Sequence, residues 1–390
     1  MARISIIGSG FGALTAARAL RRFVPSARIT LVAPAPELIY HPSLIWIPSG
    51  LRTGTDLRVD LRRFLREQNI DFHAGHMRAL RDAGRVVITE DAEVHNDGLV
   101  IASGGRFIRK LPGIEHAVTI CEGISAAESL RERLQSLDGG TIAFGFGANP
   151  QEPQAMRGGP MFELLLGVDT LLRRQGRRDR FRLLFFSPAA RPGQRLGEHA
   201  VARLFGEMRR RDIDTHLGHK LLGFERDRVR TEAGDIAADL ILFMPGMTGP
   251  AWAEASGLRL SPGGFFAADA HCRADAAERI YVAGDAGSYP GPDWMPKQAH
   301  MADLQARTAA RNLAADLRQK PAVATFRTEL VCVIDALDRG ILVYRNSRRA
   351  MVVSSRLLHW VKRFFEWLYL RRYRRAPTGG PGHSAAGGSS

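Results

Sequence analysis

The 390-residue sequence has little cysteine, no long apolar run and too few acidic side chains to balance its basic ones. Its three cysteines, Cys121, Cys272 and Cys332, are too few and too scattered for a disulfide framework or a structural zinc site. We therefore expect free thiols in a reducing compartment and no metal. No stretch of about 18 uninterrupted apolar residues occurs, so no membrane-spanning helix is expected.

The shortage of acidic residues leaves 55 Lys and Arg against 40 Asp and Glu, a formal net charge of +15. Such an excess implies attraction to an anionic partner, either nucleic acid or lipid headgroups. Much of it is concentrated between Arg345 and Arg375, where ten basic residues face Glu366 alone. No nucleic-acid recognition module accompanies these residues, so nucleic acid is not expected as a partner.

The clearest positive feature is a glycine-rich turn at the N-terminus. An apolar strand, Ile4–Ile7, leads into Gly8-Ser9-Gly10-Phe11-Gly12-Ala13, and a helix over 14–23 and a strand over 28–32 follow. This is the dinucleotide-binding pattern, in which the glycines permit a tight bend and close approach of the backbone to a pyrophosphate at the helix N-terminus. Because the first strand begins at residue 4, we expect no cleaved secretory signal.

Two separated parts of the chain carry cofactor-like features. The strand before Ser103-Gly104-Gly105 ends in small residues, and a later strand, 279–283, delivers Gly284 and Asp285 at its C-terminal end. Between them lies a second α/β unit. We therefore predict an α/β fold with two Rossmann-like dinucleotide-binding domains, the second inserted in the first.

This arrangement resembles the flavoproteins with two dinucleotide-binding domains, and within them the sulfide:quinone oxidoreductases and flavocytochrome sulfide dehydrogenases. The specific likenesses follow the turn motif along the chain. They are Tyr40-His41-Pro42-Ser43-Leu44, Gly159-Pro160-Met161-Phe162-Glu163, Met295-Pro296-Lys297-Gln298 and Cys332-Val333-Ile334-Asp335.

The resemblance implies FAD as cofactor and assigns the residues that bind it. Asp285 would accept a hydrogen bond from the ribityl chain, and Lys297, before a helix over 298–317, would stabilise negative charge on the reduced ring. The implied cofactor-binding residues are Gly8, Gly10, Phe11, Gly12, Ala13, Ser103, Gly104, Gly284, Asp285 and Lys297. The acid usually found at the end of the second strand is replaced by Ala33, and Glu37 is the nearest carboxylate.

The resemblance further implies sulfur chemistry at Cys332, since a cysteine thiolate brings the donor's electrons to the flavin. The second cysteine of the family pair is replaced by the Met156-Arg157 neighbourhood, so Cys121 is the other candidate. Glu163 is a candidate proton carrier for quinone reduction, with a helix-surface carboxylate as the alternative.

A nicotinamide site is not expected in the second unit. Its glycine turn, Gly145-Phe146-Gly147-Ala148-Asn149-Pro150, is followed by Pro153, and two prolines so placed prevent an immediate helix. The next strand ends Ser187-Pro188 without a carboxylate. NADH is therefore a poor candidate for the electron donor.

Residues 355–375 predict an amphipathic helix. Apolar side chains, including Trp360 and Trp367, recur every three to four residues and basic ones flank them, as in a helix lying in a membrane interface. The alternative is a helix docked on the protein core or a second subunit, against which the surplus of positive charge argues.

Together these features predict a peripheral enzyme of the cytoplasmic-membrane surface that passes electrons from sulfide, or a related sulfur compound, through FAD to quinone. A type-two NADH:quinone oxidoreductase and a catalytically degenerate flavin-binding membrane protein are the alternatives, and a homo-oligomer is left open. The predicted boundaries are 1–110 and 249–325 for the FAD domain, 111–248 for the inserted domain, 326–376 for membrane association and 377–390 for a flexible tail.

Overall fold

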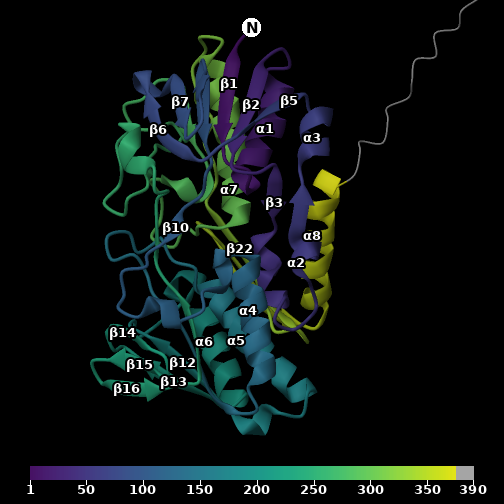
Figure 1. Cartoon of the computed structure of the whole chain (residues 1–390), viewed down its shortest axis with the longest axis vertical. Helices are drawn as coiled ribbons and strands as arrows, with labels where there is room; N and C mark the ends of the chain where they lie inside the picture. Colours follow the sequence, from purple (N-terminus) through teal and green to yellow (C-terminus); the bar gives the residue numbers. More distant parts are fainter. Residues whose placement is uncertain (375–390) are drawn as a thin grey trace, which may run out of the picture.

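A computed structural model of the chain describes residues 1–374, so the tail predicted at 377–390 lies outside the described residues. Two lobes are stacked along the long axis, and the upper one in Figure 1 contains the N-terminus. Each lobe is built around its own parallel sheet. No helix within residues 1–374 is long and apolar enough to cross a bilayer.

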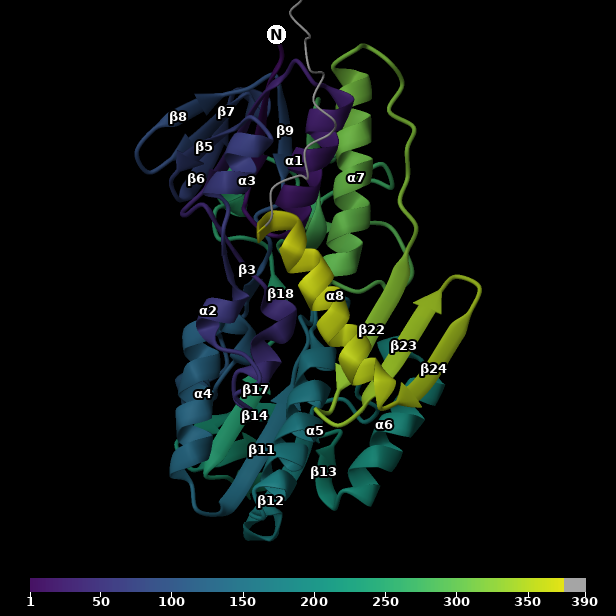
Figure 2. The ribbon, with the colours of Figure 1, turned by 90° about the vertical axis from the view of Figure 1, so that its right-hand side faces the viewer.

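The upper lobe contains a five-stranded parallel sheet in which four strands are mostly buried and one edge strand is partly exposed. Buried parallel strands read as continuous apolar runs, as in Ile4–Ile7 and Leu99–Ile101. Helices α1 (Phe11–Phe23) and α7 (Ala299–Asp316) lie side by side against it (Figure 2). The strand order is β20 (Ile280–Val282), β9 (Gly98–Ile101), β1 (Arg3–Ile7), β2 (Arg28–Ala33) and β5 (Ile70–Ala74).

The lower lobe repeats this plan with a four-stranded parallel sheet. Helix α5 (Gly158–Arg174) packs against the sheet, and Figure 1 shows α4 (Ile124–Ser136) and α6 (Glu198–Arg210) in the same lobe. The strand order is β13 (Ile213–Leu217), β12 (Phe181–Ser187), β11 (Gly140–Phe146) and β17 (Leu240–Met244).

A three-stranded antiparallel sheet accompanies each parallel sheet, which strengthens the likeness between the two lobes. Two short strands, β10 (Arg106–Phe107) and β18 (Met247–Thr248), pair where the chain leaves the upper lobe and returns to it. The predicted insertion of the second α/β unit into the first is therefore confirmed. The added sheets are β6 (Met77–Arg81), β7 (Val86–Thr89) and β8 (Glu93–His95), and β14 (Leu221–Glu225), β15 (Arg228–Thr231) and β16 (Gly234–Ala237).

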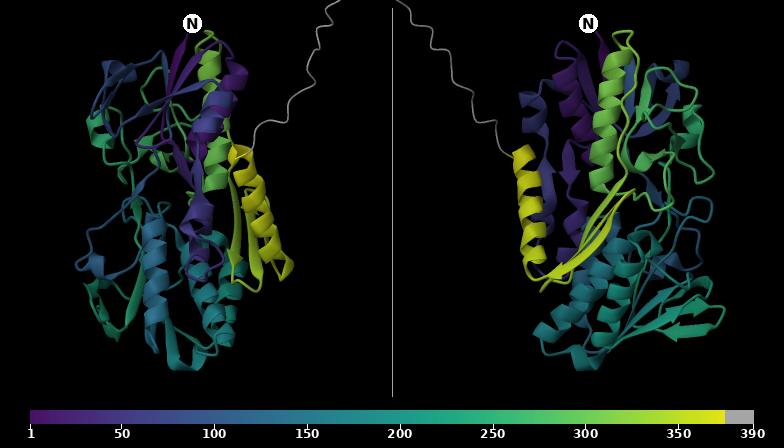
Figure 3. Two further views of the ribbon diagram at one scale, coloured as in Figure 1. Left: turned by 45° about the vertical axis from the view of Figure 1, so that its right-hand side comes forward. Right: turned by 180° about the vertical axis from the view of Figure 1, so that it is seen from behind.

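The C-terminal region forms an antiparallel sheet followed by a long helix. The sheet consists of β22 (Glu329–Asp335), β23 (Gly340–Asn346) and β24 (Ala350–Ser355), and α8 (Leu357–Arg374) runs back across the outside of both lobes (Figures 2 and 3). The helix matches the prediction. The sheet was not predicted, because the preference of a segment for a strand depends strongly on what its side chains pack against, which the local sequence does not show.

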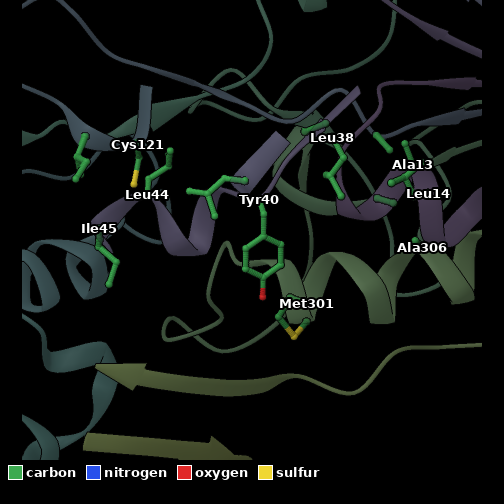
Figure 4. Packing of buried hydrophobic residues seen from close by; sticks show 14 of the residues in the cluster. Ala13, Leu14, Leu38, Tyr40, Leu44, Ile45, Cys121, Met301 and Ala306 are labelled. Atoms are coloured by element: carbon green, nitrogen blue, oxygen red, sulfur yellow. The ribbon is translucent and has the colours of Figure 1, made fainter. Parts of the chain in front are cut away.

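Shorter elements connect these layers. The helices are α2 (Gly54–Leu57), α3 (Arg62–Glu67) and the 3₁₀ segments η1 (His41–Trp46), η4 (Ile120–Glu122) and η8 (Gly284–Ala286), and the strands are β3 (Glu37–Ile39), β4 (Arg58–Asp60), β19 (Phe266–Ala267) and β21 (Gly287–Ser288). One continuous apolar core joins the lobes, and Figure 4 shows Tyr40, Leu44, Cys121 and Met301 within it.

Candidate functional site

The glycine turn between β1 and α1 has the close contacts and the open space that a bound dinucleotide requires. A Cβ on Gly8, whose φ is +113°, would lie 2.4 Å from the Ala102 carbonyl oxygen. A Cβ on Gly12 would contact Ala102 and Ala283 at 3.5 and 3.6 Å. By contrast, a Cβ on Gly10, the N-cap of α1, would meet no atom of residues 1–374 within 4 Å. The turn thus leaves room for a pyrophosphate at the helix N-terminus.

The segment after β9 completes this cradle. Gly104 has a φ of +73° and has open space around its Cβ position. The Oγ of Ser103 is buried and has no hydrogen-bond partner within residues 1–374. A buried hydroxyl without a partner is unfavourable unless a ligand supplies one, so both residues fit the predicted cofactor.

Asp285 lies beyond the end of β20, as predicted, and its carboxylate is held by another lobe. It accepts a hydrogen bond from Arg157, the residue before α5. The preceding Gly284 donates its backbone N–H to Gln305 Oε1 of α7 at 3.0 Å. Asp285 is therefore positioned by both lobes at the junction between them.

Lys297 lies near Asp285 and lines the same narrow pocket. Its Nζ donates to the Gly287 carbonyl at 2.6 Å and lies 3.8 Å from the centre of the Phe265 ring. Burial lowers its pKa to about 8, although the Asp285 charge works in the opposite direction. Lys297 is thus held inside the protein.

Cys332 of β22 faces the start of α5. Its Sγ lies 3.5 Å from the position that a Cβ on Gly159 would occupy. Burial, and then the charge of Glu163, raise the pKa of the Cys332 thiol to about 12. The resting form at neutral pH is therefore the protonated thiol.

Glu163 is buried in the second turn of α5, so its interpretation as a surface carboxylate is wrong. Both of its oxygens accept hydrogen bonds from Lys362 of α8 at 2.8 Å. Burial raises the Glu163 pKa to about 7, and Lys362 opposes that rise. Lys362 was missed in the sequence because it stands among other basic residues of α8, and no local signal separates it from them.

Arg157 stands where the resemblance expects a cysteine, and it contacts two predicted site residues. Its guanidinium bonds to Asp285 and lies beside the thiol of Cys121. Burial raises the pKa of Cys121, and the Arg157 charge works against that rise. Cys121 packs with Leu44 and Ile45 in the core, as Figure 4 shows.

The third cysteine and the carboxylate nearest in sequence to the expected ribose position both lie outside the site. Cys272 is wholly buried in the upper lobe. Glu37 of β3, the nearest carboxylate to the expected ribose position, instead forms an ion pair with Arg58 of β4 at 2.8 Å. Phe11 begins α1 and contacts Tyr369 of α8, with 4.9 Å between ring centres, while Ala13 is buried.

The second glycine turn differs from the first, because aromatic rings pack against its glycines. A Cβ on Gly145 would lie 2.4 Å from the Phe186 ring, and one on Gly147 would lie 3.2 Å from Phe243. Twelve positions separate the end of β11, at Phe146, from the start of α5, at Gly158. This turn therefore lacks the helix N-terminus that a pyrophosphate needs.

Helix α8 docks through a polar face and exposes an apolar one. His359 bonds to Asp335 at 3.0 Å, Lys362 bonds to Glu163, and Glu366 accepts from Arg52 at 2.6 Å. The prediction that its positive charge prevents docking is wrong, because these basic and acidic groups find partners. Exposed on the opposite face are Leu357, Trp360, Val361, Phe364, Phe365, Trp367 and Leu368.

The chain was compared with known protein families and sequences. A family model for pyridine nucleotide-disulphide oxidoreductases matches residues 2–149 and 183–306. Sulfide-quinone reductase of Aquifex aeolicus is 25% identical over 399 residues, covering 95% of this chain and 91% of that protein. A type II NADH:quinone oxidoreductase of Mycobacterium tuberculosis is 25% identical over 262 residues, covering 60% of this chain and 54% of its own.

Solved structures show the same fold. The sulfide:quinone oxidoreductase from Aquifex aeolicus superposes with a TM-score of 0.88 at 22% identity, covering 96% of this chain and 92% of that one. An NAD-dependent persulfide reductase from A. fulgidus has a TM-score of 0.68 at 19% identity, covering 89% and 64%. The predicted fold class and the resemblance to sulfide:quinone oxidoreductases are confirmed.

Proposed function

Because the chain belongs to the pyridine nucleotide-disulphide oxidoreductase family and is an FAD-dependent oxidoreductase, we propose that it passes electrons from sulfide, or a related reduced sulfur compound, to quinone at a membrane surface. FAD, when bound, takes two electrons from a donor and passes them to an acceptor. The sulfide-quinone reductase of Aquifex aeolicus, whose alignment covers most of both chains, is named for sulfide and quinone.

The observation that carries this proposal is the contrast between the two glycine turns. Space remains beside Gly10 and Gly104, whereas Phe186 and Phe243 pack against Gly145 and Gly147. The first turn suits FAD, with Asp285 and Lys297 close to one another beyond it. The second is a poor nicotinamide site, which favours a donor other than NADH.

Cys332 is the group that we assign to the sulfur donor. It is a partly buried thiol at the junction of the lobes, beside Glu163. Glu163, with a pKa of about 7, is suited to accept and return protons near neutral pH. Lys362 holds the Glu163 carboxylate, and Lys297 supplies positive charge toward the reduced cofactor.

Cys121 is the second sulfur that we assign to the reaction. Arg157 carries no sulfur, so a relay through a cysteine at that position is absent from this chain. The Arg157 guanidinium favours the thiolate of Cys121, since a neighbouring cation stabilises an anion. Electron entry therefore depends on Cys332, with Cys121 in support.

We propose membrane association because α8 turns its polar face toward the protein and its apolar face outward. A helix that docks through polar side chains and exposes tryptophan and phenylalanine has its apolar face available to a bilayer. Quinone, which is lipid-soluble, is the acceptor that suits an enzyme at this location. We propose the cytoplasmic-membrane surface as the site of action.

Anaerobic mixing of the FAD-loaded enzyme with sulfide or with NADH tests the donor. We expect sulfide to bleach the flavin absorbance promptly and NADH to leave it unchanged. Cys332→Ser should abolish the bleaching, while Cys272→Ser, at a buried position outside the site, should not. Bleaching by NADH but not by sulfide would overturn the proposal in favour of a type-two NADH:quinone oxidoreductase, which the mycobacterial relative represents.

A catalytically degenerate flavin-binding protein predicts a different result. Neither donor would then reduce the flavin, and Cys332→Ser would change no turnover. Reoxidation of the photoreduced flavin by a short-chain quinone tests the acceptor independently of the donor. A wild-type enzyme whose reduced flavin survives excess quinone would contradict the proposed acceptor.

A further inference from the structure

A groove of about 590 Å³ opens beside the N-terminal end of α8. Three arginines line it: Arg174 at the end of α5, Arg356 directly before α8, and Arg363 in the second turn of α8. The loop 49–51 and Leu171 also line it. Basic side chains from two elements distant in sequence thus surround one space.

None of these three arginines forms an ion pair with a carboxylate of residues 1–374, whereas Arg52, Arg157 and Arg211 all do. Arg174 donates to the Leu337 carbonyl at 3.1 Å, and the Arg363 guanidinium stacks on Trp360 at 4.8 Å. These contacts leave positive charge unneutralised in the groove.

The acidic residue that also lines the groove is Asp338. It lies 3.6 Å from Arg211 and 3.9 Å from Arg339, so its charge is already matched by other cations. His359, which also lines the groove, is bonded to Asp335. An anion entering the groove therefore meets a positive surplus.

The groove continues directly into the exposed apolar face of α8. Trp360, which is 61% exposed, belongs to both, and Phe364 follows it one turn along the helix at 57% exposure. A free inorganic anion would use only the arginines. A phospholipid would use the whole surface, because its phosphate meets guanidinium groups and its acyl chains meet the aromatic rings.

We propose that this groove binds the headgroup phosphate of an anionic phospholipid, with Arg174, Arg356 and Arg363 as its ligands. The inference rests on the membrane association proposed above and gives it a specific lipid contact. Arginine suits this role because its planar group binds phosphate oxygens in pairs. Bound lipid would also join α8 to α5 and so fix the helix over the lobe that carries Glu163.

The test uses the FAD-loaded protein and two kinds of vesicle, one of phosphatidylcholine alone and one containing phosphatidylglycerol. Wild type should bind the anionic vesicles more tightly. Arg174→Gln, a change outside α8, should weaken that binding by about tenfold, which is more than the loss of one ordinary interfacial charge produces. Binding to phosphatidylcholine should be unchanged.

Arg371→Gln is the matched control, since Arg371 stacks on Trp367 as Arg363 stacks on Trp360 but lies outside the groove. Equal losses in Arg174→Gln and Arg371→Gln would overturn the site and leave only general attraction between charges. A second outcome would also overturn the lipid assignment. In it, inorganic phosphate alone protects wild type against heat as well as lipid does, and Arg174→Gln loses this protection.

Failure of the broader proposal gives a separate result. If wild type binds neither vesicle, the membrane association itself is wrong. If wild type binds both equally and Arg174→Gln binds as wild type does, membrane association stands and the headgroup site is rejected. Unchanged melting temperatures across the variants verify that each comparison concerns binding.

Discussion

At the scale of single residues, burial next to a charge decides the chemistry of the site. Glu163 and Cys332 lie close together in the junction, and burial raises the pKa of both groups. Lys362 moderates each rise by placing a positive charge beside them. Asp285 and Arg157 form a second charged pair, at the predicted cofactor position.

Asp285→Asn should weaken FAD binding by about 10- to 100-fold, since a hydrogen bond to a charged group contributes about 1.5–3 kcal/mol. The proposed role of Asp285 is to accept a hydrogen bond from the ribityl chain. Equilibrium dialysis followed by flavin fluorescence measures the affinity. Asp293→Asn, an exposed change in a nearby loop, is the control, and equal retention of FAD by the two variants would remove this role from Asp285.

Glu163 makes a prediction about stability and pH. Its pKa is raised from 4.5 to about 7 by burial, so the folded protein retains a proton that the unfolded chain releases. The free energy of unfolding should therefore contain a contribution that is present below pH 4.5, falls as pH rises, and is lost above about pH 7.

Urea unfolding at about pH 5 and pH 7.5 checks this contribution. Glu163→Gln should lose less stability than wild type between the two conditions, because the amide cannot titrate. Glu225→Gln, at an exposed position of β14, should behave like wild type. If Glu163→Gln lost as much stability as wild type between the two pH values, the Glu163 carboxyl group would not titrate in this range.

At the scale of elements, α8 reverses the usual orientation of an amphipathic helix. Its buried contacts are His359, Lys362 and Glu366, spaced three and four residues apart, and its aromatic side chains face outward. This spacing puts the three polar groups on one face. Directional bonds hold this face to the protein, and Leu370 and Tyr373 are buried in the core near the end of the helix.

Glu366→Gln should release this helix in part. The Glu366 carboxylate is 3% exposed and accepts three hydrogen bonds from Arg52, so its loss leaves a largely buried cation unpaired. Removing one partner of such a pair costs on the order of 3 kcal/mol. We expect a lower midpoint in urea and faster tryptic cleavage within α8. Arg371→Gln, which breaks no pair with a carboxylate of residues 1–374, should leave the midpoint in urea unchanged. Resistance of Glu366→Gln to trypsin would contradict the anchoring role.

At the scale of the whole molecule, exposed apolar residues are concentrated at one end of the chain. Of the 13 large hydrophobic residues exposed within residues 1–374, ten lie between Val331 and Leu368. They come from β22, β24 and α8, which are neighbours in Figure 2. Such a concentration is typical of a surface that meets another apolar phase.

Phe365→Glu should reduce binding to vesicles by at least about tenfold, because insertion of a phenylalanine side chain is worth about 1.5–3 kcal/mol. The free energy of unfolding should change by no more than about 0.5 kcal/mol, since the residue is exposed. Flotation with vesicles and urea unfolding measure the two quantities. Leu222→Glu is the control, since Leu222 lies in β14 of the lower lobe and is 44% exposed. A similar loss of vesicle binding in both variants would show that membrane binding does not depend on α8.

Local patterns were sufficient to predict both α/β units and the C-terminal helix. The run Gly8–Ala13, the buried strand before Asp285 and the apolar period of 357–370 each produce an element whose type depends on neighbouring residues. Prolines 150 and 153 likewise predict the missing helix start after β11, because their effect on the backbone is local.

The sequence by itself therefore determined the fold class and the amphipathic character of α8, since short-range sterics and periodicity specify these, and its resemblance to a known family implied the cofactor. Only the tertiary structure decided that Arg157 meets Asp285, that Lys362 meets Glu163, and that α8 turns its polar side inward. More than a hundred positions separate the partners in the Arg157–Asp285, Lys362–Glu163 and Arg52–Glu366 contacts. Which charges become partners depends on how the lobes pack, and no spacing along the chain records that.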